Sequence, residues 1–221
     1  MGGLGSVTTA RPNTHKTKKG FNHDNSPLTG AASDFTSYFG YFSGYFRTKT
    51  RNCADQGALY LKGLVQTEKK NMERMAEAVP DANEQVLQHF LSNSPWDANV
   101  VMTQVAMRSN DALQGGEDRC LLIDKTSFLK KGTKSVGVSR QWSGTIGKVD
   151  NCQVGVFAAL GHGIHATPID CRLYLPKKWI EDPDRCEKAG VPAHRITLLR
   201  KQDLALEMVQ AARQKGISQC H

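Results

Sequence analysis

The sequence LLIDKTSFLKKGTKS at residues 121–135 carries an apolar run into one aspartate and then into a series of lysines. The run LLI predicts a short buried strand that ends at Asp124 and holds its carboxylate at the edge of a sheet. The alternative is that Asp124 only caps a turn. The residues after Asp124 favour the first interpretation, because residues 125–148 contain six basic side chains and no acidic one.

A carboxylate beside a positively charged loop suits a hard divalent cation that is bound together with a phosphodiester. Mg²⁺ takes oxygen ligands and is usually held by one or two carboxylates plus substrate phosphates. Lysine and arginine side chains would hold the backbone of the same polyanion. The candidate cation ligand is therefore Asp124, and the candidate phosphate contacts of this region are Lys130, Lys131, Lys134, Arg140 and Lys148.

The overall composition agrees with a polyanionic partner. The formal net charge is +8 and the sequence pI is about 9.2, which favours nucleic acid or an anionic membrane surface, with a merely basic surface as the alternative. No window approaches the roughly 20 apolar residues of a membrane span. The N-terminus lacks the apolar core of a secretory signal. Six scattered cysteines without a CxxC pair predict reduced thiols in a cytoplasmic protein.

The N-terminal half reads as a tail followed by helices. Residues 1–33 are poor in large apolar side chains, and we expect a disordered tail there. Residues 34–115 show helical spacing, with Thr67, Asp81 or Asn83, and Ser94 as expected helix caps. Short helices joined by tight turns suit a helix-turn-helix-like DNA-binding module, and a generic helical bundle fits equally well. In the first case the expected DNA contacts on exposed helix faces are Lys69, Lys70, Gln85 and Gln88.

The C-terminal half, residues 116–221, shows strand periodicity and one final helix. Strands are predicted in CLLID, KSVGVSRQWSG, CQVGVFAAL and HATPIDCRLYLP, with GHGI as the turn of a hairpin. The segment KKWIEDPDRCEKAGVP reads as a loop. RKQDLALEMVQAARQKG predicts an amphipathic helix that buries Leu204, Met208, Val209 and Ala212. The expected fold class is α+β, with the helical part first.

These segments resemble a known family. Residues 123–160, 169–192 and 204–213 are similar to the opening of the catalytic domain of DDE-type insertion-sequence transposases, in particular the 701-type branch. YLKGLVQTEKKNMERMAEAV and LQHFLSNSPWDANVV resemble the helical N-terminal region of the same proteins, so the similarity covers roughly residues 35–216. The resemblance implies a ribonuclease-H-like domain in which three acids hold two Mg²⁺ or Mn²⁺ ions. It makes Asp124 the first of these acids.

This chain differs from the family pattern in two ways. Related chains usually read Asp-Glu-(Ser/Thr)-Gly-Phe where this one reads DKTSF, so Lys125 replaces an acid and Ser127 a glycine. A lysine beside the cation is expected to compete with it. The resemblance also implies that the second and third acids lie on elements beyond the helix at 201–215. We therefore expect residues 116–221 to be a C-terminally truncated catalytic domain, with the strand that carries Asp124 at an edge of the sheet.

The function implied is a truncated transposase that binds double-stranded DNA at transposon ends but does not catalyse transposition. Its further partners would be full-length copies of the transposase, and its location the cytoplasm, at the nucleoid of a bacterium. One alternative is an active Mg²⁺-dependent nuclease or strand transferase whose acids are completed by a partner chain or by Asp150 and Asp170. Another is a zinc module built from His162, His165 and Cys152 or Cys171, although HxxH on a hairpin turn does not place both rings on one face.

Overall fold

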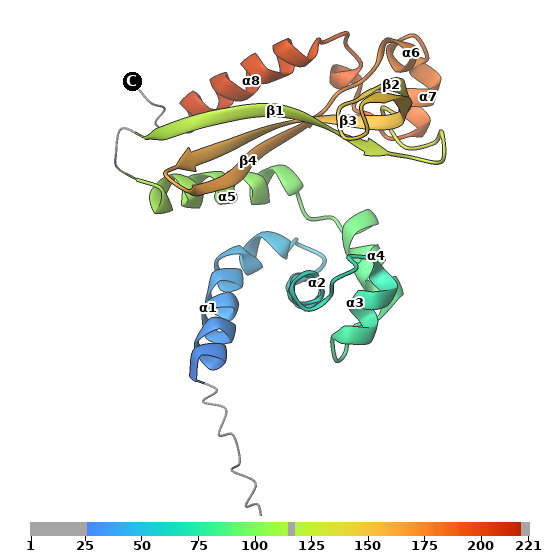
Figure 1. The fold of residues 1–221 in the computed structure, drawn as a ribbon. Coiled ribbons are helices and arrows are strands. Elements are labelled where there is room, and N and C mark those ends of the chain that lie inside the picture. Colours follow the sequence, from blue (N-terminus) through green and yellow to red (C-terminus); the bar gives the residue numbers. More distant parts are fainter. Residues whose placement is uncertain (1–25, 115–117, 218–221) are drawn as a thin grey trace, which may run out of the picture. The chain divides into compact units, whose positions relative to one another are not determined.

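The computed structural model describes residues 26–114 and 118–217 of the chain (Figure 1). By its internal contacts the chain divides into two units, residues 1–41 and 42–221. The described part begins with helix α1 (Ser26–Ser43). This helix starts at Ser26 rather than at Asp34, where the sequence suggested that order begins. Residues 1–25 of the expected tail lie outside the described residues.

Three helices of the second unit, α2 (Ala54–Gln66), α3 (Met72–Ala78) and α4 (Glu84–Ser92), contact one another pairwise. Met75 and Leu87 are fully buried among them. A Cβ at Gly63 would lie 2.8 Å from the Cβ of Met75, so α2 and α3 approach closely only because this position is glycine. The ring of Phe90 stacks on that of Trp96 at a centroid distance of 5.3 Å.

The helix caps follow the expectation at one of three places. Asn83 caps α4, and its side chain accepts hydrogen bonds from the N–H groups of Gln85 and Val86. The expectation for Thr67 is wrong, because α3 begins later under the Asn71 cap. The expectation that Ser94 is a helix cap is also wrong, since Asp97 caps α5 (Ala98–Ala112). The indole N–H of Trp96 donates to the carbonyl of Phe90 at 2.8 Å, which holds the chain before Asp97 outside the helix.

Replacing Asn83 by alanine is expected to lower the free energy of unfolding by about 1 kcal/mol, because two N–H groups at the start of α4 lose their acceptor. Urea denaturation followed by circular dichroism measures the change. Gln85→Ala serves as the control, since that side chain is exposed on the same turn and should change stability by less than about 0.5 kcal/mol. Equal losses in both variants would show that the cap does not contribute.

Four antiparallel strands form the sheet: β1 (Arg119–Leu129), β2 (Ser139–Ser143), β3 (Lys148–His162) and β4 (His165–Leu173). The long β3 pairs with β1 along one side, and with β2 and β4 near its two ends on the other side (Figure 1). Strand β1 therefore lies at an edge, as expected. The predicted hairpin turn is confirmed between β3 and β4, where Gly163 has a φ of 57°.

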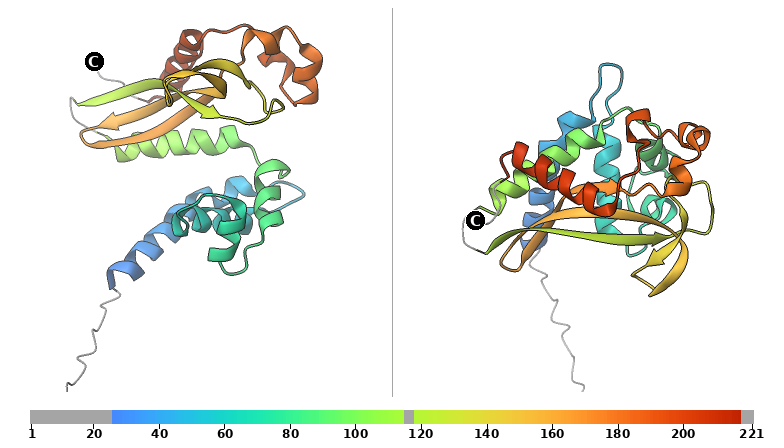
Figure 2. Two further views of the ribbon diagram at one scale, coloured as in Figure 1. Left: turned by 45° about the vertical axis from the view of Figure 1, so that its right-hand side comes forward. Right: turned by 90° about the horizontal axis from the view of Figure 1, so that it is seen from above.

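One face of this sheet is covered by α5 and α8 (Lys201–Gln214), which contact β4 and β3 respectively (Figure 2). The core contains Val156, Ala158 and Leu160 from alternate positions of β3, together with Leu204 and Met208 from α8. Ala212 is buried as predicted, whereas Val209 is only partly buried.

Among the described residues, no helix covers the opposite face of the sheet, which we call the open face. Leu122, Phe128 and Leu173 lie opposite the intervening positions of β3, and their exposed fractions are 49%, 47% and 42%.

The segment after β4 corrects the sequence interpretation. It was expected to be a loop, but it contains the helices α6 (Lys177–Ile180) and α7 (Pro183–Lys188). Asp182 caps α7, and a proline follows at the first helical position, which is a helix-start signal that the loop interpretation overlooked. Trp179 is fully buried, and its indole N–H donates to the carbonyl of Val138 at 2.8 Å. No helix among the described residues is long and apolar enough to cross a membrane.

Candidate active site

Asp124 lies in the middle of β1, not at its end. It stands opposite Phe157, and pairing continues as far as Leu129, which stands opposite Cys152. The sequence-based expectation of a strand that stops at Asp124 is wrong because β3 is long enough to offer a ladder partner to every residue of β1. The carboxylate is exposed, and its Oδ1 accepts a hydrogen bond from the N–H of Lys125 at 2.7 Å.

Lys125 does not share the surroundings of Asp124. Successive side chains of a strand point to opposite faces, and Lys125 stands opposite Val156, a residue of the core face under α8. The pKa of the Lys201 ammonium on α8 lies below its ordinary value, first because of burial and second because of the positive charge of Lys125. The side chain of Lys125 therefore projects from the covered face, on the opposite side of the sheet from that of Asp124.

Ser127, the second departure from the family pattern, lies on the same face as Lys125. Its hydroxyl is 2.7 Å from that of Ser143 and 3.2 Å from that of Thr145, so it ties β1 to the β2–β3 hairpin. Both departures thus change the covered face of the sheet and leave the open face, where Asp124 lies, unaltered.

Asp150 and Asp170 do not complete a site with Asp124. Asp170 stands opposite Ala158, a core-face position, and pairs with Arg172 at 3.4 Å. Asp150 is seven positions from Phe157 along β3, an odd number, so it lies on the covered face as well. It pairs with Lys148 at 3.9 Å. Within residues 26–114 and 118–217 no group of three or more His, Cys, Asp or Glu side chains could hold a metal ion.

The residues of the zinc alternative are held apart by the strands. His162 and His165 stand opposite each other beside the hairpin turn. Cys152 lies ten positions from His162 along β3, which is about 33 Å in an extended strand. Cys171 lies six positions from His165 along β4, or about 20 Å. These distances separate each cysteine from the two imidazoles, so the four side chains do not form one site.

The predicted phosphate contacts of the C-terminal half lie on or beside one loop. Lys130, Lys131 and Lys134 are exposed between β1 and β2. The Asn151 side chain donates to the carbonyls of Lys130 and Gly132 at 2.7 and 2.9 Å, which fixes the backbone that carries these lysines. Arg140 on β2 and Lys148 at the start of β3 are exposed as well.

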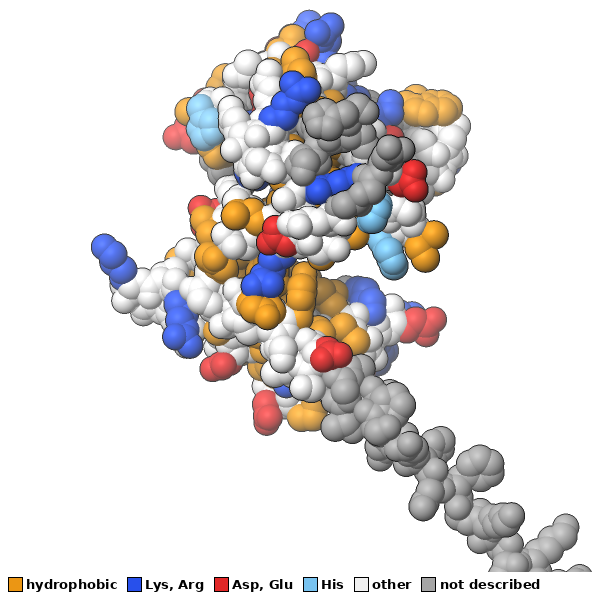
Figure 3. Space-filling model, turned by 90° about the vertical axis from the view of Figure 1, so that its left-hand side faces the viewer, with side chains coloured by type: hydrophobic (Ala, Val, Ile, Leu, Met, Phe, Trp, Pro, Cys, Tyr) orange, Lys and Arg blue, Asp and Glu red, His pale blue; other side chains and the backbone are white. Residues whose placement is uncertain are grey.

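An open groove of about 900 Å³ lies beside this loop, between β2 and the helices α6 and α7. Five basic residues and two acidic residues line this groove. The basic ones are Lys134, Arg140, Lys178, Arg185 and Lys188, and the acidic ones are Asp182 and Asp184. We call this the basic groove. In contrast, on the side of the molecule seen in Figure 3 basic and acidic side chains are interspersed.

Arg185 connects the two walls of the basic groove. Its guanidinium lies 3.8 Å from the ring centroid of Trp179 and donates to the carbonyl of Thr133 at 2.7 Å. The sequence interpretation missed Lys178, Arg185 and Lys188 because it took their segment for a loop. A signal existed in the Asp182-Pro183 pair, which marks the start of α7 and would have placed these cations on helices.

The candidates in the helical region are placed differently from one another. Lys69 and Lys70 precede α3, so the expectation that they lie on a helix face is wrong. The ammonium of Lys70 donates to the carbonyls of Leu64 and Thr67, at the C-terminal end of α2, which commits its charge to that helix end. Gln85 and Gln88 lie exposed on α4, as expected.

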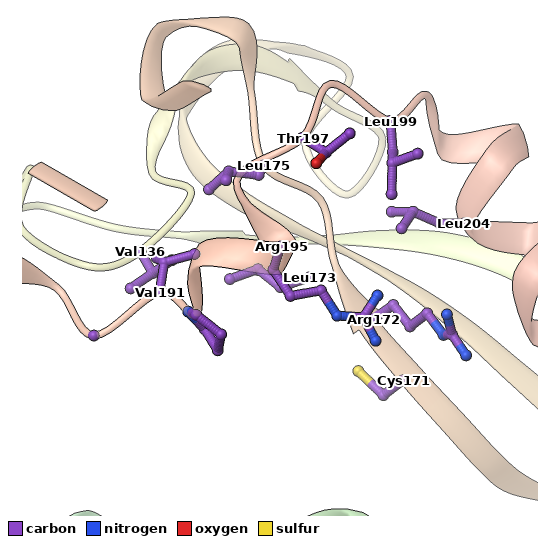
Figure 4. A pocket seen from close by; sticks show the side chains of 12 residues that line it. Val136, Cys171, Arg172, Leu173, Leu175, Val191, Arg195, Thr197, Leu199 and Leu204 are labelled. Atoms are coloured by element: carbon purple, nitrogen blue, oxygen red, sulfur yellow. The ribbon is translucent and has the colours of Figure 1, made fainter. Parts of the chain in front are cut away.

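A second cavity of about 350 Å³ lies along β4 and the segment at 190–199 (Figure 4). Its walls are mostly apolar, with Arg172 and Arg195 on one side (Figure 4). Both guanidiniums bind the same carboxylate oxygen of Glu207 on α8. Because this carboxylate offsets much of their charge, the cavity lacks the excess of positive charge that distinguishes the basic groove.

Comparison with known proteins shows which family the chain belongs to. The family model described as DDE superfamily endonuclease matches residues 41–220. The chain is 30% identical over 159 residues to the probable transposase for insertion sequence element IS701 of Microchaete diplosiphon. That match covers 69% of this chain and 40% of the relative, so the chain spans less than half of the length of that protein. No solved structure matches. Since the family model covers most of the chain, the protein belongs to the DDE superfamily endonucleases.

Proposed function

We propose that the chain binds double-stranded DNA through the basic groove and the 130–140 segment, and that Asp124 is a cation ligand facing the same DNA. The observation that carries this proposal is an exposed carboxylate on the open face of an edge strand, followed in the chain by a loop rich in lysine. Phosphate contacts from Lys and Arg supply the sequence-independent part of DNA binding.

Asp124 fits part of a Mg²⁺ or Mn²⁺ site. A carboxylate has about four lone-pair sites, and the one hydrogen bond from Lys125 leaves capacity for a cation. One carboxylate together with substrate phosphates can hold one Mg²⁺. When bound, such ions stabilise the entering and leaving oxygens of phosphodiester transfer. A pair of ions needs more acids than Asp124, and Asp150 and Asp170 lie on the covered face. We therefore propose that the described part of the chain binds DNA but does not catalyse phosphodiester transfer by itself.

The proposed partners follow from this function. A protein that occupies transposon ends without cutting them would compete there with catalytically active transposase molecules, and it would act at the bacterial nucleoid. The helical region at 34–115 is proposed as a second, helix-turn-helix-like DNA contact. Its support is the exposure of Gln85 and Gln88 on α4, because amide side chains can pair with base edges.

A gel-shift titration with duplex DNA tests the binding. With about six phosphate contacts, the affinity is expected to fall by about a thousandfold between roughly 50 and 200 mM salt. Absence of binding, or binding that does not change with salt, would contradict the proposal.

The role of Asp124 is tested in the DNA complex with Mn²⁺, whose paramagnetism broadens nearby NMR signals. We expect broadening of β1 signals around Asp124 in the native complex and its loss in Asp124→Asn, with DNA affinity unchanged within about twofold. Asp150→Asn is the matched control and should keep the broadening, because that carboxylate lies on the other face. Broadening that persists in Asp124→Asn would place the cation elsewhere.

The second candidate function is an active nuclease or strand transferase whose missing acids come from a partner chain. Its support is that Asp124 is accessible from the open face. Plasmid DNA incubated with the protein and Mg²⁺ separates the two functions. We expect no nicking above background. Nicking that disappears in Asp124→Ala would favour the active enzyme.

A further inference from the structure

Trp142 on β2 is the feature that the proposed function leaves unexplained. Its side chain is 60% exposed, and Val149, directly opposite on β3, is 49% exposed. The other two tryptophans behave differently: Trp179 is fully buried, and Trp96 packs against Phe46 and Phe90. Trp142 and Val149 therefore form an adjoining pair of exposed apolar side chains, a patch that is available to a binding partner.

The surroundings of Trp142 favour nucleic acid over an apolar protein partner. Arg140, two residues earlier on β2, projects from the same face of the strand and is exposed. Lys148, one position before Val149 on β3, projects from the other face of the hairpin. The acid of this hairpin, Asp150, lies on the other face and pairs with Lys148 at 3.9 Å. An aromatic ring with a cation beside it on the same face is an arrangement by which proteins stack on a base and hold an adjoining phosphate.

Trp142 and Asp124 project from the same face of the sheet. Their partners on β3, Val149 and Phe157, are eight positions apart, an even number. Eight positions of an extended strand measure about 26 Å. One strand of B-DNA advances about 3.4 Å per nucleotide, so this separation corresponds to about eight nucleotides. One DNA molecule along the open face can therefore reach both residues.

We propose that Trp142 stacks on an unpaired DNA base, in a single-stranded end or an extruded nucleotide, about eight nucleotides from the phosphodiester that faces Asp124. The inference rests on the proposed function, because it uses DNA bound at Asp124 as its reference point. We specify a base outside the duplex stack, because inside a duplex both faces of each base are already stacked on neighbouring bases. Arg140, which projects from the same face as Trp142, holds a phosphate beside that base.

The experiment measures binding of the full chain to a duplex with a single-stranded thymidine tail of about ten nucleotides, by tryptophan fluorescence and anisotropy. A blunt duplex and an abasic tail of equal charge are the comparison probes. We expect Trp142→Ala to raise the Kd for the thymidine tail about tenfold and to leave the Kd for the abasic tail unchanged. The salt dependence should not change, because tryptophan carries no charge. Trp142→Phe should retain most of the affinity.

Ile164→Ala is the matched control, since Ile164 is 96% exposed in the other hairpin of the same sheet. It should bind every probe as the native chain does. An equal loss of affinity for the abasic tail, or no loss for either tail, would overturn the stacking role while leaving DNA binding intact. If native emission changes with protein concentration in the absence of DNA and Trp142→Ala emission does not, this hairpin is instead a contact between two copies. Absence of binding to every probe would overturn the proposed function as well.

Discussion

Replacing Lys134, Arg140, Lys178 and Lys188 by glutamine is expected to weaken binding to duplex DNA by about three orders of magnitude at roughly 0.1 M salt. These four side chains line the basic groove from both of its walls. Each phosphate contact contributes about 0.9 to the slope of log K against log salt, so the slope should become less steep by about 3.6. Gel-shift or anisotropy titrations at several salt concentrations measure both quantities.

The matched control removes the same charge from elsewhere. Lys125, Arg195, Arg200 and Arg213 are exposed, do not line the groove and lie outside the helical region 34–115. Because salt screens charges beyond about 10 Å at 0.1 M, their replacement by glutamine should affect binding much less. If the two quadruple variants lose equal affinity and equal slope, DNA binding depends on net charge and the groove is not its site.

Replacing Trp179 by alanine is expected to lower the free energy of unfolding by about 4 kcal/mol. The indole is fully buried, and the carbonyl of Val138 loses the hydrogen bond that it accepts from the indole N–H. The guanidinium of Arg185 also loses the ring beneath it. Because this side chain holds α6 and α7 to the β1–β2 loop, the variant should also lose affinity for DNA. Urea denaturation monitored by circular dichroism gives the change in stability.

Trp142→Ala is the natural comparison for Trp179→Ala, because it removes the same side chain from an exposed position. It should change the free energy of unfolding by less than about 0.5 kcal/mol. We therefore expect Trp179→Ala to lose stability and Trp142→Ala to lose affinity for an unpaired base while keeping its stability. A loss below about 1 kcal/mol for Trp179→Ala would show that α6 and α7 are not anchored by this residue.

The elements that sequence predicted well have long periodic patterns or strong turn signals. The stripe Leu204, Met208 and Ala212 recurs every four residues and identified the buried face of α8. Gly163 in the sequence GHGI marked the β3–β4 turn. Short helices show no such periodicity, because α6 and α7 have only four and six residues, fewer than two turns each, and the Asp182-Pro183 start signal was overlooked. Their stability comes from the burial of Trp179 against residues far away in the chain.

The candidate site was predictable in its composition but not in its geometry. The sequence alone was enough to recognise the acid-free run of cations after Asp124 and the basic net charge. It was also enough to predict the final helix and to find the resemblance that led to the family. Which face each side chain occupies was decided by the tertiary structure, because strand length and register depend on the partner strand. Pairing with β3 extends β1 past Asp124, turns Lys125 and Ser127 toward α8, and keeps Asp150 and Asp170 on the covered face. The same pairing brings Trp142 to the face of Asp124, since alternation along β3 links residues that are distant in the chain.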